Sequence, residues 1–225
     1  MIWLKTFLFG YCLLTSFHTV QARSSLFCAT KSNKLYVRDP VERDIRWRHI
    51  GHANHVVAMT YLNGKLYCAT KNNKLYVRHP KQHNIGWKHI GHANRVVAMT
   101  ALNGKLFCVT KSNKLYVRSP VERDVHWKHI GHANHVVAMA AINGKLWCAT
   151  KSNKLYTRPP VERNIGWRHV GHANRLTSMA ALNGKLYCTT SRNKLYVRDP
   201  LERNIGWKHI GHANSVVGMA AGCAD

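Results

Sequence analysis

The sequence predicts an all-β fold, a five-bladed β-propeller of four-stranded antiparallel blades. A forty-residue period runs from position 23 to position 222, which is room for five copies. Within each copy, β-branched and aromatic residues recur at a period of two, which is typical of strands and not of helices. The repeated part opens with a second strand and ends with a first strand. We therefore expect the N-terminal strands to pair with the C-terminal strand and close the ring.

One copy of the repeat shows the expected strands in order. From Val56 to Asn94 it reads VVAMTYLNGKLYCATKNNKLYVRHPKQHNIGWKHIGHAN. VVAM is the first strand, and the Asn-Gly pair at 63–64 predicts a two-residue hairpin because both residues tolerate positive φ. KLYCAT is the second strand, KNN a second tight turn and KLYVR the third strand. A loop opened by proline leads to the fourth strand, WKHIGHA, so that one repeat makes one blade.

Residues 1–22 have the pattern of a secretory signal peptide. Lys5 precedes an apolar run to about Leu14, and Val20-Gln21-Ala22 is a small-x-small cleavage signal. The run is shorter than the roughly 20 residues that span a bilayer. We expect residues 23–225 to form the propeller and to be secreted, without membrane insertion.

The cysteines follow the repeat. Equivalent positions in successive repeats rarely bring Cα atoms within the roughly 7 Å that a disulfide needs, so we expect one buried thiol per blade. This series is Cys28, Cys68, Cys108, Cys148 and Cys188. Cys223 stands outside it and is a candidate for a disulfide to a second copy, which would give a homo-oligomer.

Charge is expected to be unequal at the two ends of the propeller. The chain has a formal charge of +25. Strand direction places the Asn-Gly turns and the proline loops at one end, and the KSN or KNN turns and GHAN at the other, the GHAN end. The acidic residues of the proline loops are Asp39, Glu42, Asp44, Glu122, Asp124, Glu162, Asp199 and Glu202. The GHAN end should therefore be almost wholly cationic and attract anionic ligands.

Basic residues recur at three places near GHAN. The second turn carries Lys31, Lys71, Lys111, Lys151 and Arg192, and the third strand begins with Lys34, Lys74, Lys114, Lys154 and Lys194. The residue after GHAN is His55, Arg95, His135, Arg175 or Ser215. A solvated basic face that aids solubility would explain the lysines but not their segregation. Secretion argues against nucleic acid as the partner.

GHAN, at 51–54 and every forty residues after it, joins each blade to the next. Two interpretations remain open. In the first it is scaffold, since Gly permits a tight turn, Ala is small, and Asn can bond nearby backbone. In the second it is a binding site, since Asn offers both the donor and the acceptor that neighbouring sugar hydroxyls need, and His can donate or carry charge.

NGKLYCAT, NKLYVR, a proline, a tryptophan and IGHAN followed by an aliphatic strand together resemble the repeats of the tectonin and tachylectin lectins. Those are β-propellers of secreted defence proteins and of microbes, and the resemblance covers residues 23–225. It implies sugar binding in clefts between adjacent blades, near the connection into the next inner strand. That connection is GHAN in this chain.

The resemblance, with the charge pattern, predicts the carbohydrate-binding residues. They are His52, Asn54, His92, Asn94, His132, Asn134, His172, Asn174, His212, Asn214, Trp47, Trp87, Trp127, Trp167, Trp207, Lys34, Lys74, Lys114, Lys154 and Lys194. The tryptophans start the fourth strands, where packing between blades is their other expected role. Tachylectin-like connections often carry an aromatic residue, and GHAN has none. Stacking would then come from the tryptophans or from Tyr36, Tyr76, Tyr116, Tyr156 and Tyr196.

Other chemistry has weaker support. His49 and His52 are three apart, which on a strand places them on opposite faces, so we expect no metal site. We see no catalytic constellation and expect no enzyme and no cofactor. The expected function is a secreted multivalent lectin of innate defence for microbial surface glycans, including the acidic or phosphorylated sugars of lipopolysaccharide. The alternative is a secreted scaffold whose basic face binds acidic proteins or sulfated matrix glycans.

Overall fold

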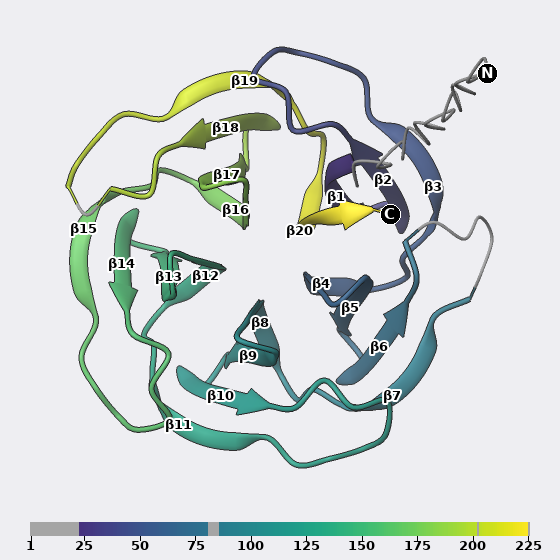
Figure 1. The fold of residues 1–225 in the computed structure, drawn as a ribbon, viewed down its shortest axis with the longest axis vertical. Helices are drawn as coiled ribbons and strands as arrows, with labels where there is room; N and C mark the ends of the chain where they lie inside the picture. The colour runs from purple at the N-terminus through teal and green to yellow at the C-terminus, as the bar shows by residue number, and fades with distance from the viewer. Residues whose placement is uncertain (1–22, 81–85, 202, 225) are drawn as a thin grey trace, which may run out of the picture.

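A computed structural model describes residues 23–80, 86–201 and 203–224. These residues form five four-stranded antiparallel sheets arranged as blades around a ring (Figure 1). The predicted five-bladed β-propeller is therefore confirmed. The proposed signal peptide and Glu202 lie outside the described residues. No helix in the described ranges is both long enough and apolar enough to cross a membrane.

The strands of each blade are given from the innermost to the outermost. Blade 1 contains β20 (Val216–Ala224), β1 (Arg23–Thr30), β2 (Lys34–Arg38) and β3 (Arg48–His52). Blade 2 contains β4 (Val56–Leu62), β5 (Lys65–Thr70), β6 (Lys74–Arg78) and β7 (Lys88–His92). Blade 3 contains β8 (Val96–Leu102), β9 (Lys105–Thr110), β10 (Lys114–Arg118) and β11 (Lys128–His132). Blade 4 contains β12 (Val136–Ile142), β13 (Lys145–Thr150), β14 (Lys154–Arg158) and β15 (Arg168–His172). Blade 5 contains β16 (Leu176–Leu182), β17 (Lys185–Thr190), β18 (Lys194–Arg198) and β19 (Lys208–His212).

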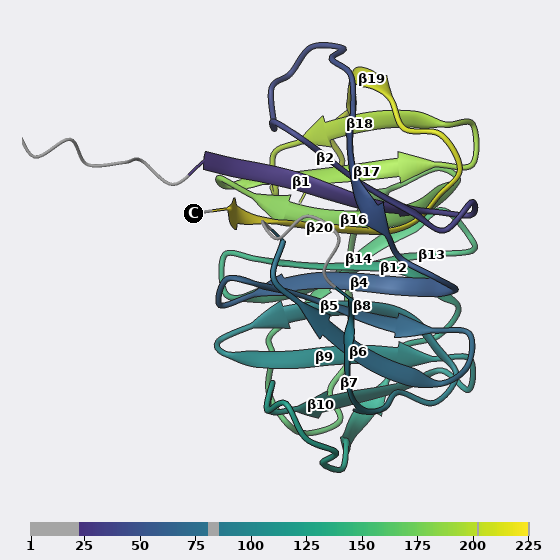
Figure 2. The same cartoon turned by 90° about the vertical axis from the view of Figure 1, so that its right-hand side faces the viewer.

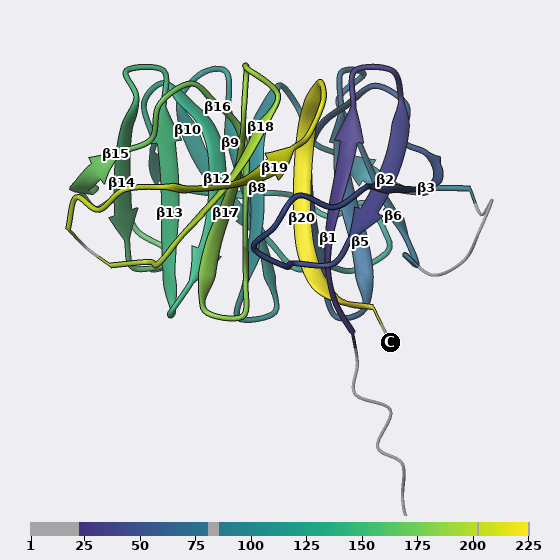
Figure 3. The ribbon, with the colours of Figure 1, turned by 90° about the horizontal axis from the view of Figure 1, so that it is seen from above.

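The ring closes in blade 1, as the phase of the repeats predicts. Strand β20 pairs with β1 from Arg23↔Ala224 to Thr30↔Val216, while β2 and β3 complete the same sheet. The first and last described residues therefore lie side by side in one blade, at the same end of the ring (Figures 2 and 3). Every blade thus has four strands, although one blade is assembled from both ends of the chain.

The second strand of each blade is buried on both faces. In β5, Leu66 and Cys68 pack in the core between blades 1 and 2, whereas Tyr67 and Ala69 pack in the core between blades 2 and 3. The period-two alternation thus distributes one strand between two hydrophobic cores. Five equivalent cores, one between each pair of neighbouring blades, hold the ring together.

The repeated cysteines belong to these cores, as predicted. Each of the five is buried and unpaired, and burial raises the pKa of each thiol well above its ordinary value. Desolvation disfavours the thiolate, which is the reactive form, so these thiols are protected. Cys223 is exposed and unpaired.

A β-bulge in the outermost strand changes the direction of its histidines. In blade 1 the register is Tyr36↔His49 and Leu35↔Gly51, so Ile50 is the extra residue. The rings of His49 and His52 consequently lie on the same face of the sheet and contact edge to face, with centroids 5.6 Å apart. The expectation that this pair would point to opposite faces is therefore wrong, because it assumed an unbroken strand. Equivalent pairs occur in the other four blades.

One blade contact departs from the repeat and gives a first prediction. Tyr61 stands where other blades have Ala101, Ala141, Ala181 and Ala221, and its hydroxyl donates to the Cys223 carbonyl. Its ring fills the space that a side chain at Gly222 would occupy. We expect Gly222→Leu to destabilise the protein by about 1–3 kcal/mol through overpacking.

The matched control is the double variant Gly222→Leu/Tyr61→Ala. It reproduces the Leu62 and Ala101 combination found between blades 2 and 3. Chemical denaturation should show that Tyr61→Ala suppresses most of the cost of Gly222→Leu, which a double-mutant cycle measures as coupling. Additive effects would contradict this packing.

Candidate binding clefts between blades

The second tight turn holds each joint between blades through its asparagine. In blade 1 the Asn33 carbonyl accepts from the Ala53 N–H at 2.8 Å, and Asn33 Oδ1 accepts from the His55 N–H at 2.9 Å. The second bond supports His55, which has a positive φ of 57°. The same side-chain bond recurs at the other joints from Asn73, Asn113, Asn153 and Asn193. The asparagine of the turn therefore has the scaffold role that GHAN was a candidate for.

Gly and Ala of GHAN are scaffold residues. Gly91 has a φ of 126°, and a Cβ there would collide with the Asp124 side chain of the next blade. Ala93 is 1% exposed within the core between blades 2 and 3. This part of the first interpretation is confirmed, because both residues occupy places that a larger side chain would not fit.

The asparagine of GHAN has a different environment. Asn54, Asn94, Asn134, Asn174 and Asn214 are exposed. None of them makes a hydrogen bond to another residue of the described ranges. Each lines a cleft between two blades, with its amide open to a ligand. The structural interpretation of GHAN therefore does not extend to its asparagine.

The five clefts repeat one arrangement. Each lies between the joint of one blade and the second and third strands of the next, and we name it by the two blades. The volumes are about 420 Å³ for the 1–2 cleft, 460 Å³ for 2–3, 500 Å³ for 3–4, 590 Å³ for 4–5 and 570 Å³ for 5–1. Such volumes are typical of small-molecule sites.

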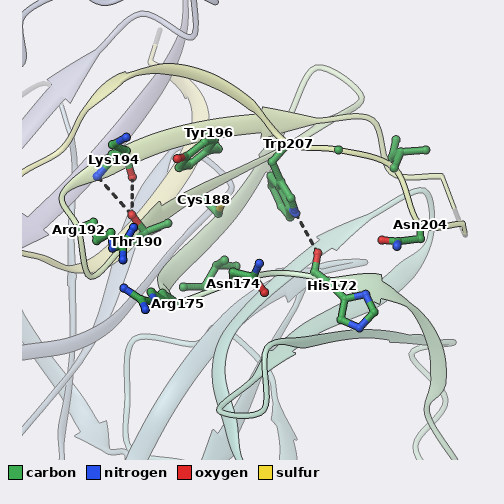
Figure 4. A pocket seen from close by; sticks show the side chains of 13 residues that line it. His172, Asn174, Arg175, Cys188, Thr190, Arg192, Lys194, Tyr196, Asn204 and Trp207 are labelled. Carbon is green, nitrogen blue, oxygen red and sulfur yellow. Dashed lines mark hydrogen bonds between the residues drawn. The ribbon is translucent and has the colours of Figure 1, made fainter.

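Aromatic side chains form part of every cleft. In the 4–5 cleft, Trp207 and Tyr196 line the wall, and Trp207 Nε1 donates to the His172 carbonyl of the preceding blade at 3.0 Å (Figure 4). Each tryptophan precedes its fourth strand by one residue and is half-buried, so it packs between blades and also faces the cleft. Packing between blades and exposure to the cleft are thus compatible for this tryptophan.

A buried arginine, which sequence reasoning missed, orders the proline loop behind the tryptophan in blades 1, 3, 4 and 5. Arg158 is 1% exposed and lies over the Trp167 ring, with its Cζ 5.6 Å from the ring centroid. Its guanidinium donates to carbonyls of the loop, including those of Val161 at 3.0 Å and Arg163 at 2.9 Å. The sequence signal that could have identified these residues is an arginine at the end of the third strand of each blade: Arg38, Arg78, Arg118, Arg158 and Arg198.

Most of the predicted site residues come together in these clefts. The joint histidine, the joint asparagine and the tryptophan line all five. Among the lysines of the third strands, Lys194 lines its cleft, whereas the following four are exposed and outside the lining: Lys34, Lys74, Lys114 and Lys154. Each lysine is in register with the joint histidine of its own blade, as in Lys34↔His52. The lysine side chain at that position is long and exposed, so its ammonium group can remain in solvent outside the cleft.

The GHAN end is less uniformly cationic than predicted. Asp124 lies in the 2–3 cleft, where its Oδ2 is 2.9 Å from His92 Nδ1, and its Oδ1 accepts from the His92 N–H. Asp44 makes the same contacts with His212 in the 5–1 cleft. The prediction failed because the proline loop crosses to the neighbouring blade and brings its last residues to the joint.

Sequence reasoning also missed the polar floor of the clefts. Thr30, Thr70, Thr110, Thr150 and Thr190, at the ends of the second strands, line all five. Their hydroxyls bond to the lysine carbonyl four residues later, as in Thr190 Oγ1 to Lys194 O at 3.4 Å. The described residues contain no group of three or more His, Cys, Asp or Glu placed to hold a metal ion.

Comparison with known proteins supports the fold. No protein-family model matches the chain, and no curated protein matches it. A solved symmetrical protein, studied for its de novo evolutionary emergence, is similar with a TM-score of 0.68 and 16% identity over 87% of this chain and 97% of that one. A chain of a nidogen/laminin complex is similar with a TM-score of 0.60 and 9% identity over 90% and 99%. At these identities the likeness extends to the fold alone.

Glutamates of the proline loops tie neighbouring blades together. Glu122 of blade 3 accepts from Lys65 and Lys88 of blade 2, with Lys88 Nζ 2.9 Å from Oε2. Glu162 pairs in the same way with Lys105 and Lys128. The glutamates of these loops therefore lie near the Asn-Gly turns, as strand direction predicts, although the last residues of the same loops reach the joints.

The glutamate contacts predict a loss of stability in acid. Hydrogen bonds from Lys65 and then Lys88 hold the pKa of Glu122 at about 2, and Lys185 and Lys208 do the same for Glu42. The ordinary value is about 4.3. A carboxyl whose folded pKa is depressed stabilises the fold above its unfolded pKa and loses that contribution as pH falls. We expect Tm to decline as pH falls from about 4.5 toward 2.

Glu122→Gln gives the matched control for this titration. Repeat two carries Gln82 at the equivalent position, so the chain already uses this substitution. The variant should have a lower Tm at neutral pH and a smaller decline in acid. An acid decline that is equally steep in the variant would show that these glutamates do not cause it.

Proposed function

We propose that the protein is a secreted, non-enzymatic, multivalent lectin of innate defence that binds microbial surface glycans. The observation that carries the proposal is the set of exposed joint asparagines without hydrogen-bond partners in the described residues. An amide offers both a donor and an acceptor, which suits neighbouring sugar hydroxyls. Aromatic side chains and a threonine accompany each asparagine in its cleft.

The symmetry of the ring supports binding to a dense surface. One cleft open to solvent is expected to bind a sugar weakly. Five clefts around one ring can engage clustered glycans together, and such avidity exceeds single-site affinity by about 10²–10⁴. A microbial envelope presents sugars in this clustered form. Secretion, proposed from residues 1–22, would bring the protein to such surfaces.

The second candidate is a scaffold that binds acidic proteins or sulfated glycans through charge. The formal charge of +25 favours it. The carboxylates of Asp44 and Asp124 in two of the clefts oppose it, because they would repel an anionic surface there. Salt distinguishes the candidates, since screening weakens exposed charge contacts more than hydrogen bonds inside a cleft.

A glycan array with the purified protein tests the proposal. We expect glycans that share one monosaccharide to be retained when salt is raised from about 0.15 M to about 0.5 M, where the Debye length shortens. The same free monosaccharide should compete for binding. Retention that follows glycan charge alone and disappears at the higher salt would overturn the lectin proposal in favour of the scaffold.

A further inference from the structure

The five clefts share most of their lining, and their polar and charged residues differ at four main positions. These are the residue after GHAN, the middle residue of the second turn, the loop residue three before the tryptophan, and the residue just before the tryptophan. In the 4–5 cleft they are Arg175, Arg192, Asn204 and Gly206. We propose that this cleft is a dedicated site for a phosphate monoester carried on a sugar. The proposal rests on the lectin function, which it makes more specific.

Three cations gather on one side of the 4–5 cleft. Arg175, Arg192 and Lys194 line it together near Thr190, while Trp207, His172 and Asn204 line the other side (Figure 4). The backbone brings the two arginines together, because the Arg175 carbonyl accepts from the N–H of Ser191, the residue before Arg192, at 2.9 Å. Arg175 is itself fixed by the bond from its N–H to Asn153 Oδ1 at 2.8 Å.

Other clefts lack this combination. The 5–1 cleft contains Arg46 together with the carboxylate of Asp44, and the 2–3 cleft contains Arg95 together with Asp124. The 3–4 cleft has His132 and His135 but no Arg, Lys, Asp or Glu in its lining. In the 4–5 cleft Asn204 replaces the aspartate, and no acidic residue of the described ranges lines it. The 1–2 cleft has Arg78 as its one cation among the described residues, and that side chain is buried over the Trp87 ring. Among the described residues, the 4–5 cleft is therefore the one that combines three exposed cations with no acidic residue.

The chemistry of the cations favours phosphate over a single carboxylate. A phosphate monoester carries a charge of about −1.5 to −2 at neutral pH and three strong acceptor oxygens. Guanidinium groups bind such oxygens in pairs, and a third cation can neutralise the rest of the dianion. The sugar ring would then lie toward Trp207 and Tyr196, with the amides of Asn174 and Asn204 near its hydroxyls.

Substitutions found elsewhere in the chain make the test. Arg175→Ser copies Ser215, which has the same positive φ, 53° against 58°. Arg192→Ser copies Ser32, Ser112 and Ser152 of the same turn. The double variant Arg175→Ser/Arg192→Ser should therefore fold with an unchanged Tm. Calorimetry at about 0.15 M salt compares it with the wild type, using glucose 6-phosphate, glucose and inorganic phosphate.

We expect the wild type to bind one equivalent of glucose 6-phosphate at least about 10-fold more tightly than glucose, and the variant to lose that preference. Inorganic phosphate, which tests the anion site without a sugar, should bind more weakly and with the same dependence on the arginines. A variant that keeps its preference for glucose 6-phosphate would overturn the proposal. So would several equivalent tight sites in the wild type.

A gain of function provides the reverse test. His135→Arg/Ser152→Arg places both arginines in the 3–4 cleft, which already has Asn164 at the loop position. A second tight equivalent of glucose 6-phosphate is expected, and its absence would count against the proposal.

The glycan array distinguishes the lectin proposal from the proposed phosphate site. If neutral glycans bind the wild type and the arginine variant alike, and phosphorylated glycans gain nothing from the arginines, the lectin stands and this inference fails. If no glycan binds but phosphate binding depends on the arginines, the anion site stands and the lectin fails.

Discussion

Alanine at all five joint asparagines is expected to abolish binding to glycan surfaces while the ring remains folded. The variant carries Asn54→Ala, Asn94→Ala, Asn134→Ala, Asn174→Ala and Asn214→Ala. Each change removes an exposed amide that has no partner among the described residues and lines a cleft. Surface changes of this kind usually alter stability by less than about 0.5 kcal/mol each. Circular dichroism should therefore show an unchanged fold with a modest shift in Tm.

The expected loss of binding is large because the sites act together. A neutral hydrogen bond contributes about 0.5–1.5 kcal/mol, which is up to roughly 10-fold in one cleft. On a clustered surface the loss applies at every engaged cleft, so the avidity of about 10²–10⁴ disappears with it. Surface plasmon resonance on an immobilised glycan from the array measures the change. Binding within about 3-fold of the wild type would assign the sugar contacts to other residues.

The other asparagine series is the matched control. Asn113→Ala removes the side-chain bond to the His135 N–H and places alanine at a φ of 61°. We expect a cost of about 2 kcal/mol, from a lost hydrogen bond and from backbone strain. A single such change should leave binding at the remaining clefts intact. If Asn134→Ala were as destabilising as Asn113→Ala, the joint asparagine would be scaffold after all.

Deletion of residues 216–225 is expected to abolish cooperative folding. The deletion removes β20, which is the innermost strand of blade 1 and pairs with the inner edge of β1 from Arg23 to Thr30. It also opens two cores, because Val216 and Met219 pack in the core between blades 5 and 1, and Ala220 in the core between blades 1 and 2. Burial of Val and Met contributes about 1.5–3 kcal/mol each, comparable in sum with the stability of a whole domain.

Moving the strand instead of removing it separates two explanations. A permuted chain in which residues 216–222 precede Ser25 through an Asn-Gly turn keeps all four strands of blade 1. It loses only the closure of the ring by strands from opposite ends of the chain. We expect this chain to fold with a lower Tm in thermal denaturation. A deletion variant that still unfolds cooperatively near the wild-type Tm would contradict the role of β20.

The sequence predicts the fold more completely than it predicts the site. The Asn-Gly pairs, the period-two alternation and the complementary ends depend on local preferences and on strand pairing, so they specify blade number, strand order and closure. The two asparagine series could not be separated in this way. Asn33 and Asn54 occur equally in the repeats, and only the position of the His55 N–H shows which one supports the backbone.

The sequence by itself determined a five-bladed ring and its buried thiols, because both follow from the period and direction of the strands. Clefts between adjacent blades were implied by the resemblance to lectin repeats and not by the strand pattern. Contacts between blades decided the rest. The bulge at Ile50 places two histidines on one face of the sheet. The proline loop places Asp44 and Asp124 at the joints. Arg175 and Arg192 line the same cleft. These pairings join residues of different strands, loops or blades, so they depend on the path of the chain through space and not on local pattern.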